Sequence, residues 1–198
     1  MEILLIRHGQ SEGDILHVHE GRADFPLTKL GVEQAQKMAR RVKVEFQPEY
    51  IWSSPLQRAS KTATILADKI NCPIKFLPEL QEIDNGKLAR RPVDEGPHLR
   101  DLLPHQKLGG DGESKVEIRT RAEYVLSFIN QNSIHFKRIA IVSHGVMIKN
   151  LLDSFLNLPV TNDLWFATGD TAIHFIEYTK IGRRISFTNN DSHLLNNE

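Results

Sequence analysis

The sequence predicts an α/β fold, a three-layer sandwich in which helices cover both faces of a mostly parallel central sheet. Short apolar runs alternate along the chain with segments whose apolar residues recur every three or four positions, the spacing of one helix face. Successive strand–helix units of this kind place neighbouring strands parallel and pack their helices against the sheet. The length of 198 residues suits a single domain that covers residues 1–198.

The first half of the chain contains three short strands and two helices. The first strand is the apolar run Ile3–Ile6, and Tyr50–Trp52 and Pro73–Phe76 are the next two. Thr28 suits the N-cap of the first helix, and Pro48 ends that helix. The apolar residues of the first helix are Ala35, Met38, Ala39, Val42 and Phe46. Those of the second helix are Ala59, Ala63, Leu66, Ala67 and Ile70.

The second half contains two more helices and three more strands. Arg138–Val142 is the clearest strand of the chain, and Ala172–Tyr178 and Ile185–Thr188 form a closing pair around Gly182. One helix begins after Ser114 and precedes the clearest strand; the other follows that strand. The apolar residues of these two helices are Ile118, Ala122, Val125 and Ile129, then Ile148, Leu151, Leu152 and Phe155.

An irregular segment over residues 84–113 interrupts the alternation. It shows neither the period of a strand nor that of a helix, and it is rich in glycine and proline. Long irregular segments of compact domains are usually functional or disordered, and we expect this one to form a lid over a site. Its glycines and prolines are Gly86, Pro92, Gly96, Pro97, Pro104, Gly109, Gly110 and Gly112.

Composition and charge narrow the class of function. The 25 basic and 25 acidic side chains give a formal net charge of zero, which argues against binding of nucleic acid or a membrane surface through a basic excess. The lone cysteine, Cys72, excludes an intramolecular disulfide, and its apolar neighbours predict a small core residue. The amino-terminal apolar run is too short for a signal sequence, and no apolar run reaches the roughly 18 residues that span a bilayer. We therefore expect a cytoplasmic protein.

Two histidine–glycine pairs follow the two strongest predicted strands. Arg7-His8-Gly9 ends the first strand, and Ser143-His144-Gly145 ends the clearest one. Ligands of open α/β sheets bind just beyond the carboxyl ends of the strands, and a glycine there lets the backbone turn sharply and a ligand approach closely. Histidine acts as a nucleophile or general base, and arginine offers a fork of donors that suits phosphate. Either pair alone also fits a structural strand end, but two together favour a site.

Arg58 and an acidic pair lie near two further strand ends. Arg58 falls in the first turn of a predicted helix, where free N–H groups already attract anions, so a bound anion explains a cation at this position. A solvated surface arginine is the alternative. Glu82 and Asp84 follow the third strand, where a carboxyl group beside an anion suits a general acid. Their spacing alone also fits ordinary surface acids.

These residues combine into a cationic pocket for one phosphoryl group at the carboxyl edge of the sheet. The chain has no Walker-type glycine-rich loop and no metal-ligand motif to accompany the pocket. A phosphoryl transfer without a metal needs a protein nucleophile and positive neighbours, and histidine is a competent nucleophile. The expected members of the pocket are Arg7, His8, Arg58 and His144.

The motifs resemble those of the histidine phosphatase superfamily, in its phosphoglycerate mutase-like branch. The resemblance covers nearly the whole chain, in the family's order, and the motifs are specific jointly rather than singly. They are Leu5-Ile6-Arg7-His8-Gly9-Gln10-Ser11-Glu12, Gly21 to Thr28, Gly31 with Gln34-Ala35, Ser53 to Ala59, Thr62-Ala63, Leu80 with Glu82 and Gly86, Gly112-Glu113-Ser114, Ser143-His144-Gly145 and Asn190 to Leu194.

The resemblance implies a role for each matching residue. His8 would be the nucleophile that becomes transiently phosphorylated, with Arg7, Arg58 and His144 holding the phosphoryl oxygens. Glu82 would protonate the leaving oxygen and then activate water. No metal and no organic cofactor is implied. The catalytic set is Arg7, His8, Arg58, Glu82 and His144, and the substrate-binding set is Arg7, Gln10, Asp14, Gly21, Arg58, His144 and Gly145.

The chain departs from the family's pattern at two places. Asp14 stands where the family often has asparagine, and a carboxylate near phosphate would repel it. Leu88 is followed by Ala89-Arg90-Arg91 rather than by the family's usual acid and glycine. The two arginines of the expected lid either bind a second anionic group of the substrate or form a solvated loop pair.

Three functions are compatible with these residues. The resemblance favours a phosphomonoesterase acting on a small phosphorylated substrate over a phosphoglycerate mutase, because in the family's mutases the segment that encloses the site is longer than residues 84–113. A non-catalytic phospho-ligand binding module is the third function, and the intact set of candidate residues argues against it. Sugar phosphates, phosphoglycerates, a nucleotide-loop precursor of cobalamin and phosphoproteins all stay open as substrates, as does the oligomeric state.

Overall fold

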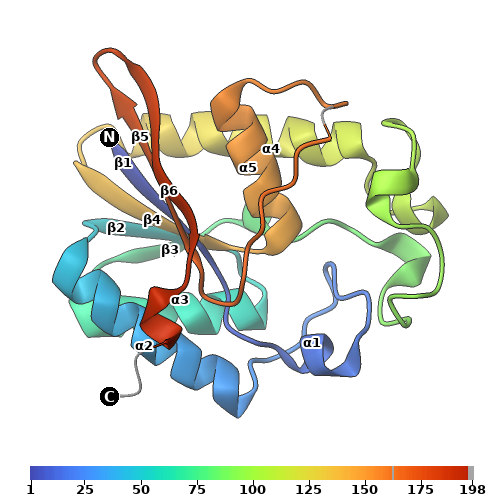
Figure 1. Cartoon of the computed structure of the whole chain (residues 1–198), viewed down its shortest axis with the longest axis horizontal. Coiled ribbons are helices and arrows are strands. Elements are labelled where there is room, and N and C mark those ends of the chain that lie inside the picture. Colours follow the sequence, from blue (N-terminus) through green and yellow to red (C-terminus); the bar gives the residue numbers. More distant parts are fainter. Residues whose placement is uncertain (162, 196–198) are drawn as a thin grey trace.

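The computed structural model describes residues 1–161 and 163–195, and its centre is one mixed β-sheet. The strand order is β3-β2-β4-β1-β5-β6, in which β1, β2, β3 and β4 run parallel and β5 and β6 antiparallel to their neighbours (Figure 1). The bounds are β1 Glu2–Arg7, β2 Tyr50–Ser53, β3 Ile74–Phe76, β4 Arg138–Ser143, β5 Ile173–Thr179 and β6 Gly182–Asn190. The predicted α/β sandwich is confirmed.

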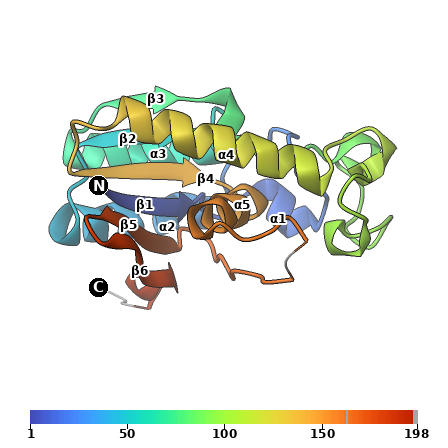
Figure 2. The same ribbon diagram turned by 90° about the horizontal axis from the view of Figure 1, so that it is seen from above.

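Two helices cover each face of this sheet. Seen from above, α4 and α5 lie in front of the strands, and α2 and α3 lie behind them (Figure 2). The alternation of β1 explains both layers, because Ile3 and Leu5 pack with α4 and α5 while Leu4 and Ile6 pack with α2 and α3. The bounds are α1 Glu12–Leu16, α2 Lys29–Glu45, α3 Gln57–Ile70, α4 Lys115–Asn132 and α5 Gly145–Leu156.

The predicted helix starts agree with the caps. The Thr28 hydroxyl accepts the N–H of Gly31 at the start of α2, and Ser114 forms a capping box with Glu117 at the start of α4. Helix α1 was absent from the sequence prediction, because five residues are too few to show a helical period. Strand β6 is longer than the predicted Ile185–Thr188 and extends over Gly182–Asn190.

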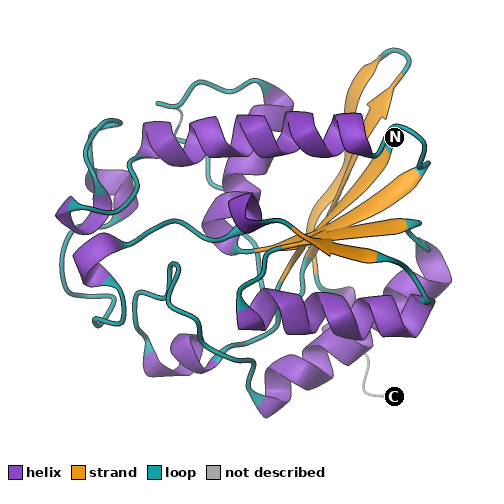
Figure 3. Cartoon of the chain, turned by 180° about the vertical axis from the view of Figure 1, so that it is seen from behind, coloured by secondary structure: helices purple, strands orange, loops and turns teal. Residues whose placement is uncertain are grey.

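The segment over residues 84–113 is irregular, as predicted, and contains short 3-10 turns at Gly86–Leu88, Leu99–Asp101 and Leu108–Gly110 (Figure 3). Its two ends are joined, because Glu113 N–H donates to the Asp84 carbonyl at 2.8 Å and Asp84 N–H donates to the Glu113 carboxylate at 2.9 Å. The segment is therefore a loop whose two ends are hydrogen-bonded to each other, and it lies at the amino end of α4 (Figure 1). That it closes over the site stays a prediction.

Cys72 lies at the margin of the core, not inside it. Its side chain is partly buried against the cluster between the sheet and the α2–α3 layer. Burial, with a contribution from Glu49, raises the pKa of its thiol to about 11, so the thiol stays protonated. Among the described residues, no helix combines the length and apolar character needed to cross a membrane.

Candidate active site

The predicted site residues meet at the carboxyl ends of β1 and β4. These strands are parallel neighbours in which Arg7 pairs with Ser143, so the residues that follow each strand share one edge of the sheet. His8 and His144 are both buried, and their ring centroids are 5.0 Å apart. Arg58 reaches them from the first turn of α3. The structure thus brings together all four members of the predicted pocket.

His8 is held in one tautomer. Its Nε2 lies 3.2 Å from Nε of Arg58, which can only donate, so Nε2 carries the lone pair. Its Nδ1 lies 2.7 Å from the Gly9 carbonyl and donates its proton there. Burial first, and then the charges of Arg58 and Arg7, hold the pKa of this imidazole well below its usual value. His8 is therefore neutral, with a lone pair on Nε2, which is the form a nucleophile needs.

Arg58 organises the loop beside His8. Its guanidinium is fully buried and donates to the carbonyls of Gly21 at 2.7 Å and Ala23 at 2.9 Å. Gly21 has a φ of +48°, and a side chain there would approach Asn85 and the Ile83 carbonyl to 2.7 Å. Glycine is thus required at this turn, and the carbonyl that it offers holds Arg58 in place.

Arg7 is held by residues of α1 and of the loop before β5. One amino group donates to the Thr168 carbonyl at 2.8 Å, and the other lies 3.2 Å from Asp14 and 3.6 Å from Asp170. Its Nε is buried and has no hydrogen-bond partner within residues 1–161 and 163–195. His144, which follows β4, also has an unpartnered buried nitrogen. Its Nε2 lies 2.8 Å from the Ser54 hydroxyl, while its buried Nδ1 has no partner in the described part of the chain. Buried polar atoms normally have partners, so both atoms are suited to bind a ligand here.

The carboxylate of Glu82 contacts the backbone of the first turn of α5. One carboxylate oxygen accepts the N–H groups of Ile83 and Met147, each at 3.0 Å, and the other accepts the N–H of Val146 at 3.0 Å. The carboxylate is thus next to Gly145 and His144. Asp84, which the sequence left as an equal candidate, instead accepts the N–H of Gly86 at the base of the 84–113 segment.

The remaining predicted substrate-binding residues make contacts that support the arginines and the backbone. The Gln10 side chain accepts the Thr28 hydroxyl at 2.9 Å, and Asp14 accepts the N–H of Ser11 at 2.8 Å besides pairing with Arg7. Gly145 is the first residue of α5, and a Cβ built there meets no heavy atom within 4 Å. Packing therefore does not require this glycine. Substrate contact by Gln10, Asp14, Gly21 and Gly145 stays a prediction.

The two arginines of the 84–113 segment have partners of their own. The Arg90 guanidinium lies 4.7 Å from the ring centroid of Phe25, and the exposed Arg91 side chain is 3.9 Å from the Glu95 carboxylate. These contacts fit the solvated loop pair better than a second anion site.

Sequence reasoning missed two acids of this site. Glu20 lies 3.5 Å from Arg58, and Asp170 lies 3.6 Å from Arg7. Burial is the main cause that raises the pKa of both carboxyl groups. The predicted pocket of two arginines and two histidines therefore also has acids beside its arginines. Asp170 comes just before β5, and only the antiparallel pairing of β5 with β1 brings it here; no local pattern signals that pairing.

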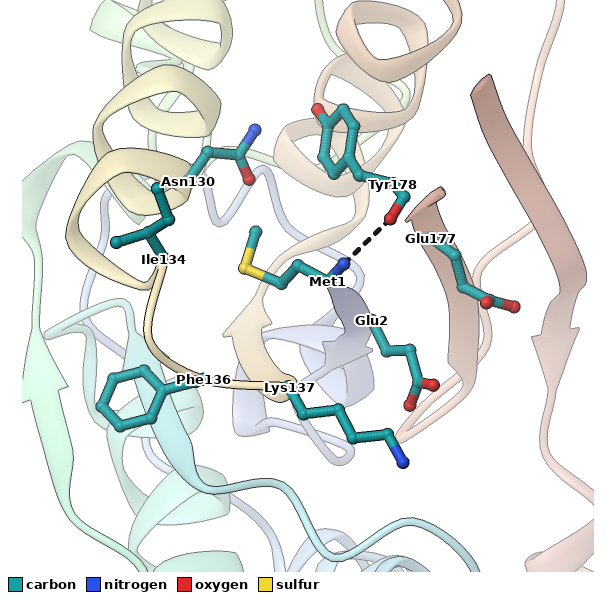
Figure 4. Close-up of a pocket in the computed structure, with 8 residues that line it drawn as sticks. All are labelled: Met1, Glu2, Asn130, Ile134, Phe136, Lys137, Glu177 and Tyr178. Atoms are coloured by element: carbon teal, nitrogen blue, oxygen red, sulfur yellow. Dashed lines mark hydrogen bonds between the residues drawn. The ribbon is translucent and has the colours of Figure 1, made fainter. Parts of the chain in front are cut away.

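A hollow lies at the opposite edge of the sheet. It has a volume of about 570 Å³ and is lined by residues at the starts of β1 and β4, among them Met1, Glu2 and Lys137 (Figure 4). Its acids are already paired: Glu2 with Arg138 and Glu177 with Arg184. Since the parallel strands separate it from His8 and His144, it has no part in the site described above. Among the described residues, no group of three or more His, Cys, Asp or Glu side chains is placed to hold a metal ion.

Comparison with known proteins agrees with the motifs. The model of the histidine phosphatase superfamily (branch 1) matches residues 3–191. A probable phosphoglycerate mutase GpmB of Proteus mirabilis is 32% identical over 185 residues, which cover 90% of this chain and 85% of that protein. A phosphoserine phosphatase mutant from Entamoeba histolytica, in complex with phosphoserine, is 25% identical with a TM-score of 0.83, and 98% of each chain is covered. A putative alpha-ribazole-5'-P phosphatase of Escherichia coli shares the fold with a TM-score of 0.85 at 23% identity, covering 96% of this chain and 97% of that one.

The family match spans nearly the full length of the chain and includes both histidine–glycine pairs, and the solved structure that is 25% identical is a phosphoserine phosphatase. The predicted resemblance is thereby confirmed. The chain is an enzyme of the histidine phosphatase superfamily, branch 1.

Proposed function

We propose that the chain is a metal-independent phosphomonoesterase that passes the phosphoryl group of a small phosphorylated metabolite to His8 and then to water. The tautomer of His8 is the observation that carries this proposal. A neutral, buried imidazole with its lone pair on Nε2, beside two arginines, is prepared to attack phosphorus. The solved phosphoserine complex of a similar phosphatase supports a small phosphorylated substrate.

The proposed reaction has two balanced steps. His8 Nε2 forms a bond to phosphorus while the bond from phosphorus to the alcohol oxygen breaks, and Glu82 in its protonated form gives its proton to that oxygen. The resulting Glu82 carboxylate then takes a proton from water as the water oxygen attacks the phosphohistidine and releases His8. Arg7, Arg58 and His144 stabilise the charge on the phosphoryl oxygens in both steps.

A panel of phosphomonoesters, assayed with a chelator present, tests this function. We expect turnover of at least one ester and, after rapid quenching with labelled substrate, a phosphoenzyme that is labile in acid and stable in base. Loss of turnover in chelator would contradict the metal-independent reaction. If no ester turns over and no phosphoenzyme forms, the chain is a phospho-ligand binding module instead.

A phosphoglycerate mutase is the second candidate, since a relative 32% identical over 185 residues is named as a probable one. The two functions differ in the acceptor of the phosphoryl group. We expect labelled phosphoenzyme, when chased with an excess of phosphoglycerate, to release inorganic phosphate to water. Rapid transfer of the label to phosphoglycerate, with little release, would show a mutase.

Gly145 offers a test of where the phosphoryl group lies. A methyl group at this position meets no protein atom, so we expect Gly145→Ala to leave the free energy of unfolding unchanged or to raise it by up to about 1 kcal/mol. The same methyl group would crowd an oxyanion at the start of α5, so kcat/KM should fall roughly tenfold or more. Urea unfolding and steady-state kinetics measure the two effects. Wild-type kcat/KM in this variant would show that the phosphoryl group does not approach Gly145.

A further inference from the structure

Glu20 is a partly buried acid beside the nucleophile, and the proposed reaction gives it no role. Its side chain is 13% exposed. One carboxylate oxygen lies 2.5 Å from the Ser11 hydroxyl, and the other lies 3.5 Å from Nε of Arg58. This Nε is the same atom that donates to His8 Nε2 at 3.2 Å. Glu20 and His8 therefore share one hydrogen-bond donor, the Nε–H of Arg58.

The surrounding residues make room for Glu20 and orient it. Gly13 is buried in α1, and a Cβ at this position would come within 2.3 Å of the Glu20 carboxylate. Ser11, fully buried, is the N-cap of α1, and its one hydroxyl proton is shared between the carboxylates of Glu20 at 2.5 Å and Asp14 at 2.9 Å. The carboxylate thus occupies a space that a larger residue than glycine would fill.

The charges that act on Glu20 come from three elements: Arg58 belongs to α3, Arg7 ends β1 and Asp14 belongs to α1. Asp14 and Asp170, which precedes β5, both approach Arg7. In the described part of the chain, two arginines are thus approached by three carboxylates, while burial keeps His8 and His144 neutral. A phosphoryl dianion bound by Arg7 and Arg58 would meet like charges at close range, which favours protonation of a neighbouring carboxyl group.

Attack by His8 sharpens this conflict at Arg58. When the lone pair of Nε2 turns to phosphorus, the Nε–H of Arg58 must find another acceptor, since a buried donor left unpaired is costly. Both the Glu20 carboxylate and a phosphoryl oxygen can accept it, and both carry negative charge. The other two Arg58 nitrogens already donate to Gly21 and Ala23, so the competition concerns this one donor.

We propose that Glu20 competes with the phosphoryl group for Arg58 and takes up one proton from solvent when that group binds. The inference rests on the proposed function and adds a proton-linked affinity for the anionic substrate. Burial and Asp14 already raise the pKa of Glu20 in the free enzyme, and a bound dianion raises it further. Between those two pKa values binding takes up a proton, so affinity falls as pH rises through that range; below both values it is independent of Glu20.

Titration calorimetry of the full chain with inorganic phosphate, in buffers of different ionisation enthalpy, tests the proposal. We expect wild-type protein to take up about one proton more than Glu20→Gln, after the titration of phosphate itself cancels between the two. We also expect Glu20→Gln to bind phosphate roughly tenfold more tightly at about pH 8, with the two affinities converging as the pH falls and Glu20 becomes protonated in the free wild-type enzyme. Urea unfolding of Glu20→Gln shows whether the variant is folded. The proton uptake of the wild-type protein can be measured without any variant.

Two comparisons complete the experiment. Glu12→Gln changes an exposed acid of α1, near Glu20 in sequence, and should keep the wild-type proton uptake. Equal proton uptake and equal pH dependence in wild-type and Glu20→Gln would overturn the proposal. It would also be overturned if Asp170→Asn, and not Glu20→Gln, abolished the proton uptake. If phosphate binding takes up the proton but no ester turns over, the proposed function fails and this inference stands. If esters turn over normally but phosphate binding takes up no proton at Glu20, this inference fails and the proposed function stands.

Discussion

His8→Ala is expected to abolish phosphoenzyme formation and to lower kcat by at least about 10⁴-fold, the scale on which loss of a nucleophile acts. The lone pair on Nε2 is the group that forms the covalent bond, and Arg7 and Arg58 cannot replace it because they only donate. The remaining arginines and His144 still bind phosphate, so we expect the variant to keep affinity for inorganic phosphate while losing turnover.

The fold should survive this substitution. Arg58 retains Gly21, Ala23 and Glu20 as partners when the imidazole is removed. Rapid quenching with labelled ester measures the phosphoenzyme, and urea unfolding measures the fold. His135→Ala, at an exposed histidine after α4, is the matched control and should behave as wild-type protein. Turnover near the wild-type rate in His8→Ala would refute the covalent mechanism.

Arg58→Ala is expected to lower stability and activity together. The guanidinium is fully buried and satisfies two backbone carbonyls, His8 Nε2 and the Glu20 carboxylate at once. Its removal leaves a buried carboxylate without its counter-charge, a change that typically costs about 3–5 kcal/mol of unfolding free energy. Loss of a cation at the phosphoryl group should lower kcat/KM by roughly 10³-fold.

A double-mutant cycle separates these two effects. We expect Glu20→Gln to restore part of the stability of Arg58→Ala, because it removes the uncompensated buried charge, but to restore no activity. Arg58→Lys should also stay nearly inactive, since one ammonium group does not reproduce the planar fork that reaches His8, Gly21 and Ala23. Urea unfolding and ester kinetics on the four proteins of the cycle provide the measurements. Unfolding free energy of Arg58→Ala within about 1 kcal/mol of wild type would show that the buried network is not structural.

The sequence by itself determined the layers and most of the site. Short apolar runs place the strands, and apolar residues every three or four positions place the four long helices, since both patterns are local consequences of which faces are buried. The same patterns place Arg7-His8 and His144-Gly145 after parallel strands, and the carboxyl ends of adjacent parallel strands meet at one edge. The placement of both histidines at this edge therefore follows from local signals and one topological rule, whereas their close approach depends on the pairing of β1 with β4 in the folded sheet.

The tertiary structure decided how the acids are placed, and it alone revealed Glu20 and Asp170 beside the arginines. Glu82 and Asp84 are two residues apart and look alike in sequence, yet only Glu82 reaches α5, because the path of the chain after β3 turns one toward the helix and the other toward Gly86. Glu20 and Asp170 approach the arginines through a loop and an antiparallel strand pairing. Such contacts between distant parts of the chain depend on how the whole core packs, and no local period or cap records them.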